Sequence, residues 1–318
     1  MDARQKIISI LDQLNTVLVG KSAQVQDCVA CLLAGGHLLI EDLPGVGKTT
    51  LAHALANLLG LSFSRIQFTS DLLPADITGV SVYERQSGEF RFLPGPVFAQ
   101  MVLADEINRA TPKTQSALLE AMEERQVTVA GTTHPLPEIF LVMATQNPIE
   151  QEGTYPLPEA QVDRFMLKVV INYPSKSEEQ LIVRQNTLGL VAPVINPVAS
   201  TSEILTAKEL VRQVYLDEKV ENYILDIVFA TRFPEKYNLP KLKPLIGFGG
   251  SPRASINLAL AAKAYAFLNK RGYVIPEDVR SICKDVLRHR IGLTYEAEAE
   301  NVNVEQIIDE ILRVVNVP

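Results

Sequence analysis

Residues 37–50, HLLIEDLPGVGKTT, place a short apolar run before a glycine-rich turn and the start of a helical pattern. The apolar run 38–40 predicts a buried strand, and LAHALANLLG (51–60) predicts a helix that ends at a glycine. A strand, a tight glycine-rich turn and a helix in this order are the context of a phosphate-binding loop, because backbone N–H groups and the positive end of the helix converge on phosphate oxygens. This stretch therefore predicts a phosphate-binding α/β core.

Side chains of this loop have separate expected roles. Lys48 is expected to reach the β- and γ-phosphates of a nucleotide, and the Thr49 hydroxyl to hold Mg²⁺. Asp42 stands where the pattern G-x-x-x-x-G-K-[ST] has its first glycine, so the loop is a variant of that pattern; an ordinary glycine-rich turn is the alternative. The residues predicted to surround the phosphates are Pro44, Gly45, Val46, Gly47, Lys48, Thr49 and Thr50.

Composition places the chain among soluble globular proteins. Its 318 residues are 47% hydrophobic and 21% charged, enough for two domains, and no apolar run is long enough to span a bilayer. The first residues, MDARQKIISILDQL, form an amphipathic helical pattern without the features of a secretion signal, so a cytoplasmic location is expected. The net charge of −7 disfavours broad, non-specific binding of nucleic acid.

The spacing of cysteine and histidine does not indicate a metal site. Cys28 and Cys31 form a C-x-x-C pair, but they lie in the apolar helical stretch DCVACLLAGGH and no second pair follows. We interpret them as small buried hydrophobic residues rather than metal or redox ligands. The other candidates, which show no ligand spacing, are Cys283, His37, His53, His134 and His289.

Further apolar runs predict the rest of a sheet. They are SFSRIQF (62–68), MVLADE (101–106), IFLVMATQN (139–147) and FMLKVVI (165–171). Apolar strands that alternate with helical patterns indicate a parallel sheet, here of five strands, covered on both faces. Ligands of such sheets bind beyond the carboxyl ends of the strands, where the third and fourth strands end in polar residues.

Two segments are longer than a simple crossover between strands requires. In residues 69–100, alternating apolar residues flank a turn at 86–88, and in residues 125–136 two valines precede Gly131. Each pattern predicts an inserted β-hairpin. We expect both hairpins to be working projections, with incidental loops as the alternative.

The last third of the chain changes to a mainly helical pattern. Residues 189–200 contain prolines and no helical period, so they predict a linker between a nucleotide-binding core (1–188) and a small helical lid (201–318). Thr206 and Glu209 form a capping-box pattern for a helix that starts near Ala207. Further lid helices are predicted to begin at Pro252, at Pro276 and near Asn303.

The third strand ends in two adjacent carboxylates, Asp105 and Glu106. Their side chains are expected on opposite sides of the strand, so they suit different tasks. Asp105 fits the Walker-B role, in which it binds Mg²⁺ directly or through water beside Thr49; Glu106 fits a general base that polarises the attacking water. The amide of Asn147, after the fourth strand, is expected to sense the γ-phosphate. The alternatives are a solvent-facing acidic pair and a simple Asn-Pro turn.

In order and spacing, the segments PGVGKT, LADEIN, ATQNP, LPEAQVDRF and GGSPRA resemble the motifs of AAA+ ATPases of the MoxR type, over essentially the whole chain. The resemblance implies a P-loop AAA+ α/β core with a parallel five-stranded sheet, followed by a small all-helical lid. It also implies a helix-2-insert hairpin within Thr69–Gln100 and a pre-sensor-1 hairpin within Arg125–Leu136. Hydrolysis of ATP to ADP and phosphate, with Mg²⁺, is the implied activity, in a homo-oligomeric ring that we expect to be a hexamer.

Residue roles follow from the same resemblance. Asn147 matches sensor 1, and Arg164 matches the arginine finger that enters the ATP site of the neighbouring subunit. Arg253 matches sensor 2, which the lid delivers to the γ-phosphate so that hydrolysis rotates the lid against the core. Val19 and Gly20 are expected to lie against the adenine. MoxR-type proteins are implied to remodel or activate client proteins in a chaperone-like way, with partners that often contain von Willebrand factor A domains.

Physical chemistry supports the two arginine roles, because a phosphoryl-transfer transition state spreads negative charge over several oxygens. Arg253 falls in the first turn of a predicted helix, where a cation opposes the helix dipole, and a bound phosphate would explain its placement. A surface salt bridge with Asp163 or Glu159 is the alternative for Arg164. Gln67 is a candidate for coupling Glu106 to a partner, and Arg109 for acting between subunits.

Two other functions are compatible with parts of the sequence. A DNA translocase shares these inserts, but the tip of the second hairpin, Val-Ala-Gly-Thr-Thr, carries no Lys or Arg to follow phosphates. A nucleotide-gated scaffold would bind ATP and assemble with little hydrolysis, and the presence of Glu106 and Arg164 argues against it.

Overall fold

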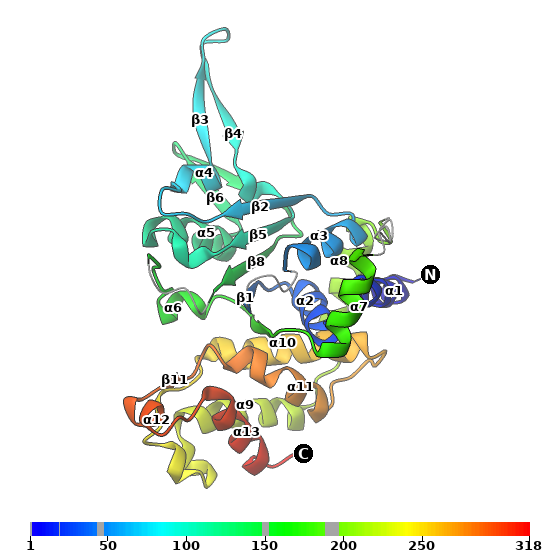
Figure 1. The fold of residues 1–318 in the computed structure, drawn as a ribbon, viewed down its shortest axis with the longest axis vertical. Coiled ribbons are helices and arrows are strands. Elements are labelled where there is room, and N and C mark those ends of the chain that lie inside the picture. The colour runs from blue at the N-terminus through cyan, green and yellow to red at the C-terminus, as the bar shows by residue number, and fades with distance from the viewer. Residues whose placement is uncertain (1, 19, 43–47, 148–152, 188–196) are drawn as a thin grey trace.

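The computed structural model describes residues 2–18, 20–42, 48–147, 153–187 and 197–318 (Figure 1). At its centre lies a five-stranded sheet in the order β2-β5-β8-β1-β9, and all neighbouring strands run parallel. The strands are β1 (Leu38–Asp42), β2 (Phe63–Gln67), β5 (Met101–Asp105), β8 (Leu141–Gln146) and β9 (Leu167–Ile171). The five predicted strands are therefore confirmed.

Alternate residues of the strands pack into two different cores, as the pleat of a sheet requires. Leu38, Ile40 and Leu103 join the larger cluster, with α1 (Ala3–Val17), α2 (Ser22–Ala34) and α3 (Lys48–Leu58). Leu39 and Val102 face the smaller cluster, with α5 (Pro112–Glu124). Both faces are covered, which explains why the strands read as continuous apolar runs. Cys28 and Cys31 are buried on α2, as expected.

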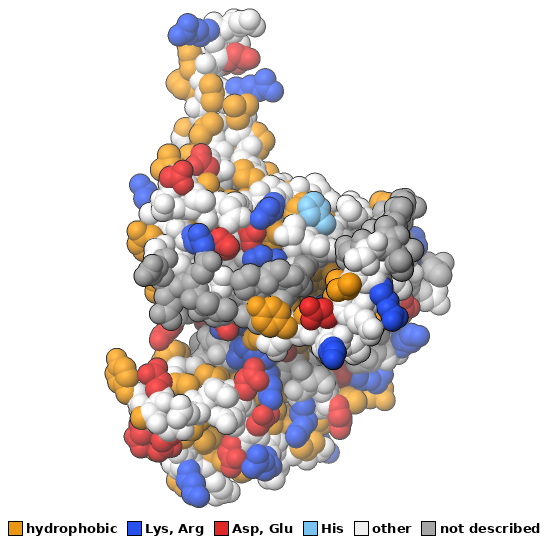
Figure 2. Space-filling model, viewed as in Figure 1, with side chains coloured by type: hydrophobic (Ala, Val, Ile, Leu, Met, Phe, Trp, Pro, Cys, Tyr) orange, Lys and Arg blue, Asp and Glu red, His pale blue; other side chains and the backbone are white. Residues whose placement is uncertain are grey.

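Both predicted hairpins are present. Strand β3 (Gly79–Glu84) pairs with β4 (Glu89–Pro94), and β6 (Gln126–Val129) pairs with β7 (Thr132–Pro135). Short helices α4 (Pro74–Thr78) and η1 (Pro96–Phe98) flank the first hairpin, which projects far beyond the sheet (Figure 1). Apolar side chains are visible along this projection, with charged ones near its tip (Figure 2). The rings of Phe92 and His134 stack 3.9 Å apart and join the two hairpins.

The lid is built mainly from helices, which are α8 (Thr201–Arg212), α9 (Glu218–Arg232), α10 (Pro252–Leu268), α11 (Pro276–Leu287), α12 (Tyr295–Ala299) and α13 (Val304–Val314). It also contains β10 (Ile246–Phe248) and β11 (Gly292–Leu293), which pair antiparallel, and the 3₁₀ turns η3 (Pro234–Tyr237) and η4 (Pro240–Leu242). The larger core cluster continues from the sheet into these helices. The predicted end of the core at residue 188 and most of the linker lie outside the described residues, so this division stays a prediction.

One predicted helix start is wrong. Helix α8 begins at Thr201, because Ser200 and Glu203 form the capping box: the backbone N–H of Ser200 donates to Glu203 Oε2 at 2.9 Å. Thr206 lies inside this helix, where its hydroxyl donates to the carbonyl of Ser202. The predicted starts at Pro252 and Pro276 are confirmed.

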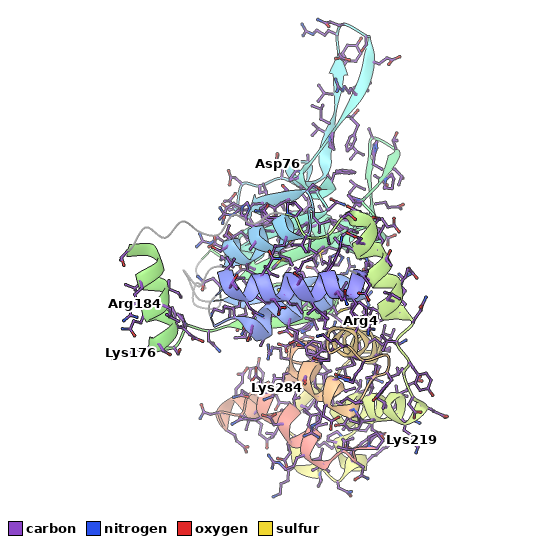
Figure 3. All side chains as sticks on the ribbon, turned by 90° about the vertical axis from the view of Figure 1, so that its right-hand side faces the viewer. Arg4, Asp76, Lys176, Arg184, Lys219 and Lys284 are labelled. Carbon is purple, nitrogen blue, oxygen red and sulfur yellow. The ribbon has the colours of Figure 1, made fainter. Side chains whose placement is uncertain are left out.

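Helix α7 (Lys176–Thr187) stands away from the sheet, as the labels Lys176 and Arg184 show in Figure 3.

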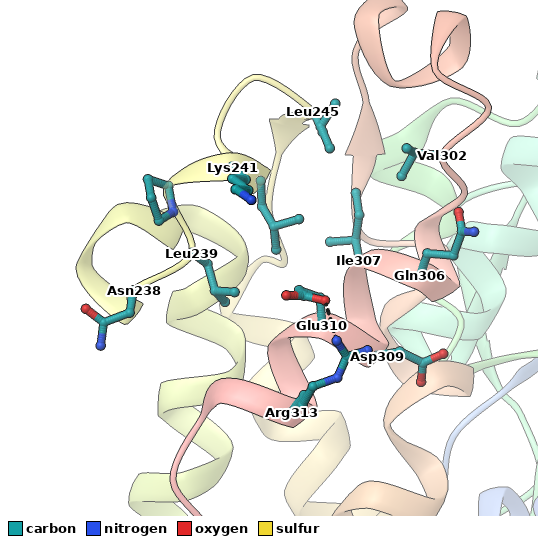
Figure 4. A pocket seen from close by; sticks show the side chains of 12 residues that line it. Asn238, Leu239, Lys241, Leu245, Val302, Gln306, Ile307, Asp309, Glu310 and Arg313 are labelled. Carbon is teal, nitrogen blue, oxygen red and sulfur yellow. Dashed lines mark hydrogen bonds and ion pairs between the residues drawn. The ribbon is translucent and has the colours of Figure 1, made fainter.

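A hollow of about 750 Å³ in the lid lies between residues 238–245 and α13 (Figure 4), and it contains none of the predicted site residues. Among the described helices, none is long and apolar enough to cross a membrane.

Candidate active site

The predicted nucleotide site lies at the carboxyl ends of β1, β5 and β8, where Lys48 opens α3. The loop residues Pro44, Gly45, Val46 and Gly47, and also Val19, fall outside the described residues. Thr49 is partly buried in the first turn of α3, and Thr50 is exposed. Gly20 adopts a φ of +73°, in the left-handed region that favours glycine, and it lies against the Glu178 carboxylate of α7.

Asp105 is the centre of the described part of the site. Its Oδ1 lies 3.0 Å from Lys48 Nζ and accepts a hydrogen bond of 2.8 Å from Thr145 Oγ1. Its Oδ2 accepts two hydrogen bonds from Arg65, of 2.6 and 3.2 Å. Burial alone would raise the pKa of Asp105, but the donors Arg65, Lys48 and Thr145 outweigh it and hold this pKa below its ordinary value. The carboxylate is therefore ionised and available to a cation.

Glu106 lies just beyond β5, in the left-handed region with a φ of 57°. Its backbone N–H donates to Thr145 Oγ1 at 2.9 Å. Its Oε2 accepts a hydrogen bond of 3.0 Å from Gln67 Nε2 and lies 2.9 Å from Arg109 Nε. The two adjacent carboxylates therefore have different side-chain partners, and Gln67 and Arg109 both contact the predicted base.

Arg65 was not among the predicted site residues. It lies on the edge strand β2, where it holds Asp105 and also donates to Gln67 Oε1 at 2.9 Å. A chain of contacts thus links Asp105 to Glu106 through Arg65 and Gln67. These contacts arise because β2 pairs with β5. The alternating sequence SRIQ alone does not show which strand lies beside it, so the role of Arg65 could not be predicted.

Asn147 follows β8, which lies between β1 and β5 in the sheet. It lines a hollow of about 300 Å³ together with Gln146, Glu41 and Lys168. Lys168 and Glu41 form an ion pair within this hollow. Asn147 thus lies directly beyond a central strand, and its role as a sensing amide stays a prediction.

The two predicted arginines meet at one carboxylate. Arg164 Nε lies 2.9 Å from Glu123 Oε2, and Arg164 also donates to the carbonyl of Leu119 at 3.1 Å. Arg253 donates to Glu123 Oε1. The suggested salt bridge of Arg164 with Asp163 or Glu159 is therefore wrong, because the end of α5 supplies a different acidic partner.

Asp163 instead connects the segment around Arg164 to the lid by hydrogen bonds. It accepts hydrogen bonds from Arg290 Nε at 2.8 Å and from Ser251 Oγ at 2.9 Å. Arg290 is 2% exposed and also donates to the carbonyls of Phe165 and Met166. Burial lowers the pKa of Arg290 to about 10, while Asp163 opposes this shift. Sequence reasoning missed Glu123 and Arg290, because their partners are 130 and 127 residues away along the chain.

Comparisons with known proteins agree with this geometry. A model of the ATPase family associated with various cellular activities matches residues 37–167, and an AAA lid domain model matches residues 242–311. The chaperone MoxR1 of Mycobacterium tuberculosis is 45% identical over 306 residues, which cover 96% of this chain and 81% of that protein. This chain belongs to the MoxR-type AAA+ ATPases. Members of this family bind nucleotides.

Other relatives of this MoxR-type ATPase match over nearly their whole length. The uncharacterized protein YeaC of Bacillus subtilis is 47% identical, with 97% of this chain and 93% of that protein covered. The crystal structure of a protein from Cytophaga hutchinsonii that is assigned as an ATPase has a TM-score of 0.93 and 46% identity. The match covers 99% of this chain and 96% of the C. hutchinsonii chain. The predicted AAA+ core and lid are therefore confirmed.

Proposed function

We propose that this MoxR-type protein hydrolyses ATP to ADP and phosphate at sites shared between neighbouring subunits of a ring, with six subunits as the expected number. One subunit supplies Lys48 to the phosphates and Glu106 as the base that polarises the attacking water. Asn147 senses the γ-phosphate from the end of β8. The loop 44–47 and Thr50 complete the phosphate cradle, and Val19 and Gly20 contact the adenine.

Thr49 and Asp105 suit Mg²⁺. A hydroxyl and an ionised carboxylate are hard oxygen ligands of the kind that this cation prefers. The lowered pKa of Asp105 supports the proposal, because a protonated carboxyl would bind the cation poorly. Mg²⁺ would neutralise charge on the phosphates when bound, while Arg65 and Thr145 hold Asp105 in place.

The observation that carries the shared site is the separation of two groups of residues along the sheet. Lys48 and Asp105 lie at the carboxyl ends of the strands. Glu123 lies at the amino ends of the strands. The carbonyl of the adjacent Met122 contacts His37, which directly precedes β1. Arg164, the partner of Glu123, also precedes a strand, β9. A strand of five residues spans roughly 16 Å, too far for an arginine side chain to bridge.

Both arginines therefore point away from the phosphates of their own subunit. We place Arg164 and Arg253 together at the ATP of the neighbouring subunit, since both contact Glu123. This proposal keeps the expectation that the lid delivers Arg253 to a γ-phosphate, and assigns that phosphate to the neighbouring subunit. It keeps the expectation that Arg164 is supplied by a neighbour.

We propose further that ATP hydrolysis drives chaperone-like remodelling of client proteins, with von Willebrand factor A domain proteins as partners. The name of the M. tuberculosis relative, chaperone MoxR1, supports a role of this kind. The β3–β4 hairpin offers exposed apolar surface for a client, including Val82, Tyr83 and Phe90, which is 73% exposed.

Mixing two variants tests the shared site. Arg164→Ala keeps its own Lys48–Asp105 site, and Glu106→Gln keeps its arginines, so each is expected to be inactive alone. A mixture of the two should recover a measurable part of the wild-type ATP turnover, because each supplies what its neighbour lacks. No recovery, with mixed rings verified by sizing and cross-linking, would exclude the shared arrangement.

A further inference from the structure

Glu123 connects two arginines that come from different parts of the chain. Its Oε2 lies 2.9 Å from Arg164 Nε, and its Oε1 accepts a hydrogen bond from Arg253. Arg164 follows the short helix α6 (Glu159–Val162), whereas Arg253 lies in the first turn of the lid helix α10. One carboxylate thus sets the spacing of two guanidinium groups across the boundary between core and lid.

The helix that carries Glu123 is fixed on both sides of it. Val142 N–H donates to His37 Nδ1 at 3.0 Å, so the proton of this ring is on Nε2, which donates to the Met122 carbonyl at 3.3 Å. Arg125 donates to the carbonyl oxygens of Gly35 at 2.7 Å and Phe140 at 2.9 Å. Glu123 therefore projects from a rigid support.

The backbone segments that carry the two arginines are also tied to each other. Ser251 caps α10, where its Oγ accepts the N–H of Arg253 at 3.2 Å and donates to the Asp163 carboxylate. Arg290 holds the same carboxylate from within the lid. Glu123 restricts both arginine side chains, and Arg164 is held in addition by the carbonyl of Leu119 at 3.1 Å.

Electrostatics gives Glu123 a specific task. Two neighbouring guanidinium groups repel each other, and Arg253 is further disfavoured by the positive end of α10. The carboxylate and the negative end of α5 compensate both effects. The three side chains keep exposed fractions of 32%, 43% and 35% for Arg164, Arg253 and Glu123, so these ion pairs contribute little to stability.

The exposed sides of both arginines can be reached from outside the subunit. The polar hollow of about 430 Å³ beside Arg164 is lined by the carboxylates of Glu120, Glu123 and Glu124, so a phosphate would have to approach from the exposed side of the arginines instead. A triphosphate carries more negative charge than one carboxylate, so the arginines can exchange a part of their contacts with Glu123 for contacts with phosphate oxygens.

We propose that Glu123 is a positioning residue, which holds Arg164 and Arg253 as a preset pair for the nucleotide of the neighbouring subunit. This inference rests on the shared site proposed above. Preset donors stabilise a transition state better than mobile ones, because their orientation is fixed before the reaction. Loss of Glu123 therefore lowers the rate of hydrolysis while the subunit's own nucleotide site stays intact.

The test compares Glu123→Gln with Glu120→Gln, a control one turn earlier on the same helix that lines the same hollow. Glu123→Gln should lower kcat by about tenfold or more, with unchanged affinity for a fluorescent ATP analogue. The control should keep wild-type turnover. Unchanged or raised turnover in Glu123→Gln would overturn the proposal, and a raised rate would identify Glu123 as a brake.

Two further measurements separate positioning from a general structural role. Glu123→Gln should recover turnover when mixed with Glu106→Gln, and it should leave the nucleotide affinity and the melting temperature of the Arg164→Ala/Arg253→Ala double variant unchanged. A lower affinity or melting temperature in that triple variant, or a lowered melting temperature for Glu123→Gln alone, would overturn the assignment. Full turnover in Arg164→Ala would instead refute the shared site itself, so the two failures are distinguishable.

Discussion

Thr145 donates a hydrogen bond of 2.8 Å to Asp105, and the same hydroxyl accepts the backbone N–H of Glu106 at 2.9 Å. Thr145 is fully buried on the central strand β8. One hydroxyl group therefore sets the orientation of both acidic residues at the end of β5. Neither the proposed Mg²⁺ ligand, Asp105, nor the proposed base, Glu106, can move without affecting the other.

Thr145→Val should lower both stability and turnover, because valine has a similar volume but leaves the Glu106 N–H without a partner. The expected loss of unfolding free energy is about 1–3 kcal/mol, and turnover should require more Mg²⁺. Thr145→Ser keeps the hydroxyl and serves as the control. Urea unfolding and Mg²⁺ titrations of ATP turnover provide the measurements; equal Mg²⁺ requirements in both variants would exclude this role.

Glu106→Gln should bind ATP without hydrolysing it and should accumulate as assembled rings. The glutamine cannot accept a proton, but it can still contact Gln67 and Arg109, which both reach the Glu106 carboxylate in the structure. Size-exclusion chromatography with ATP, followed by nucleotide analysis of the ring fraction, checks this outcome. Wild-type turnover in this variant would show that Glu106 is not the base.

Arg253→Ala should resemble Arg164→Ala. Because Arg253 contacts Glu123 at the amino end of the sheet, its loss should leave ATP affinity unchanged at protein concentrations too low for assembly, and should abolish turnover of the ring. Fluorescent nucleotide titration of dilute protein makes the measurement, with Lys113→Ala on the exposed side of α5 as a control. Weaker ATP binding in dilute Arg253→Ala would place this arginine in its own subunit's site.

The contribution of Asp27 to the stability of the protein should decrease as the pH rises. Burial between α2 and α10 raises the pKa of Asp27 to about 7 and repulsion from Asp285 adds to this, while a hydrogen bond from Tyr265 opposes it. The folded protein then binds a proton that the unfolded chain has lost, so the contribution of Asp27 to the unfolding free energy falls between about pH 4 and pH 7. From pH 5 to pH 8 this loss is on the order of 2–3 kcal/mol.

Asp27→Asn should remove this contribution, since the amide oxygen still accepts the Tyr265 hydroxyl but carries no charge; from pH 5 to pH 8 the wild type should therefore lose about 2–3 kcal/mol relative to the variant. Urea midpoints at pH 5 and pH 8 for the wild type, for Asp27→Asn and for the exposed control Asp12→Asn make the comparison. The same fall in all three proteins would mean that another group is responsible.

Regular patterns made much of this fold predictable from sequence. The five strands and both hairpins follow from apolar runs and from turns at glycine, which depend on neighbouring residues only. The start of α8 was misplaced because the pattern S-x-x-E at Ser200 lay in a segment interpreted as a linker, and a similar pattern followed at Thr206.

Side-chain partnerships across the fold were not predictable in the same way. Glu123 lies in a helix end rich in glutamate, Glu120-Ala-Met-Glu-Glu124, where no local feature distinguishes one carboxylate from another. Only the packing of α5 against the segment around Arg164 and against α10 selects it. Arg65 was unpredictable for the same reason, because its partner Asp105 comes from the adjacent strand.

The stack of Phe92 on His134 couples the β3–β4 hairpin to the β6–β7 hairpin. His134 belongs to the β6–β7 hairpin, which connects α5 to β8, so a displacement of either element reaches the base of the β3–β4 arm. An arm of six-residue strands is roughly 20 Å long, and a tilt of about ten degrees at its base moves its tip by about 3.5 Å. Under the proposed function, a small rearrangement near the sheet would move the tip of this hairpin far enough to displace a bound client.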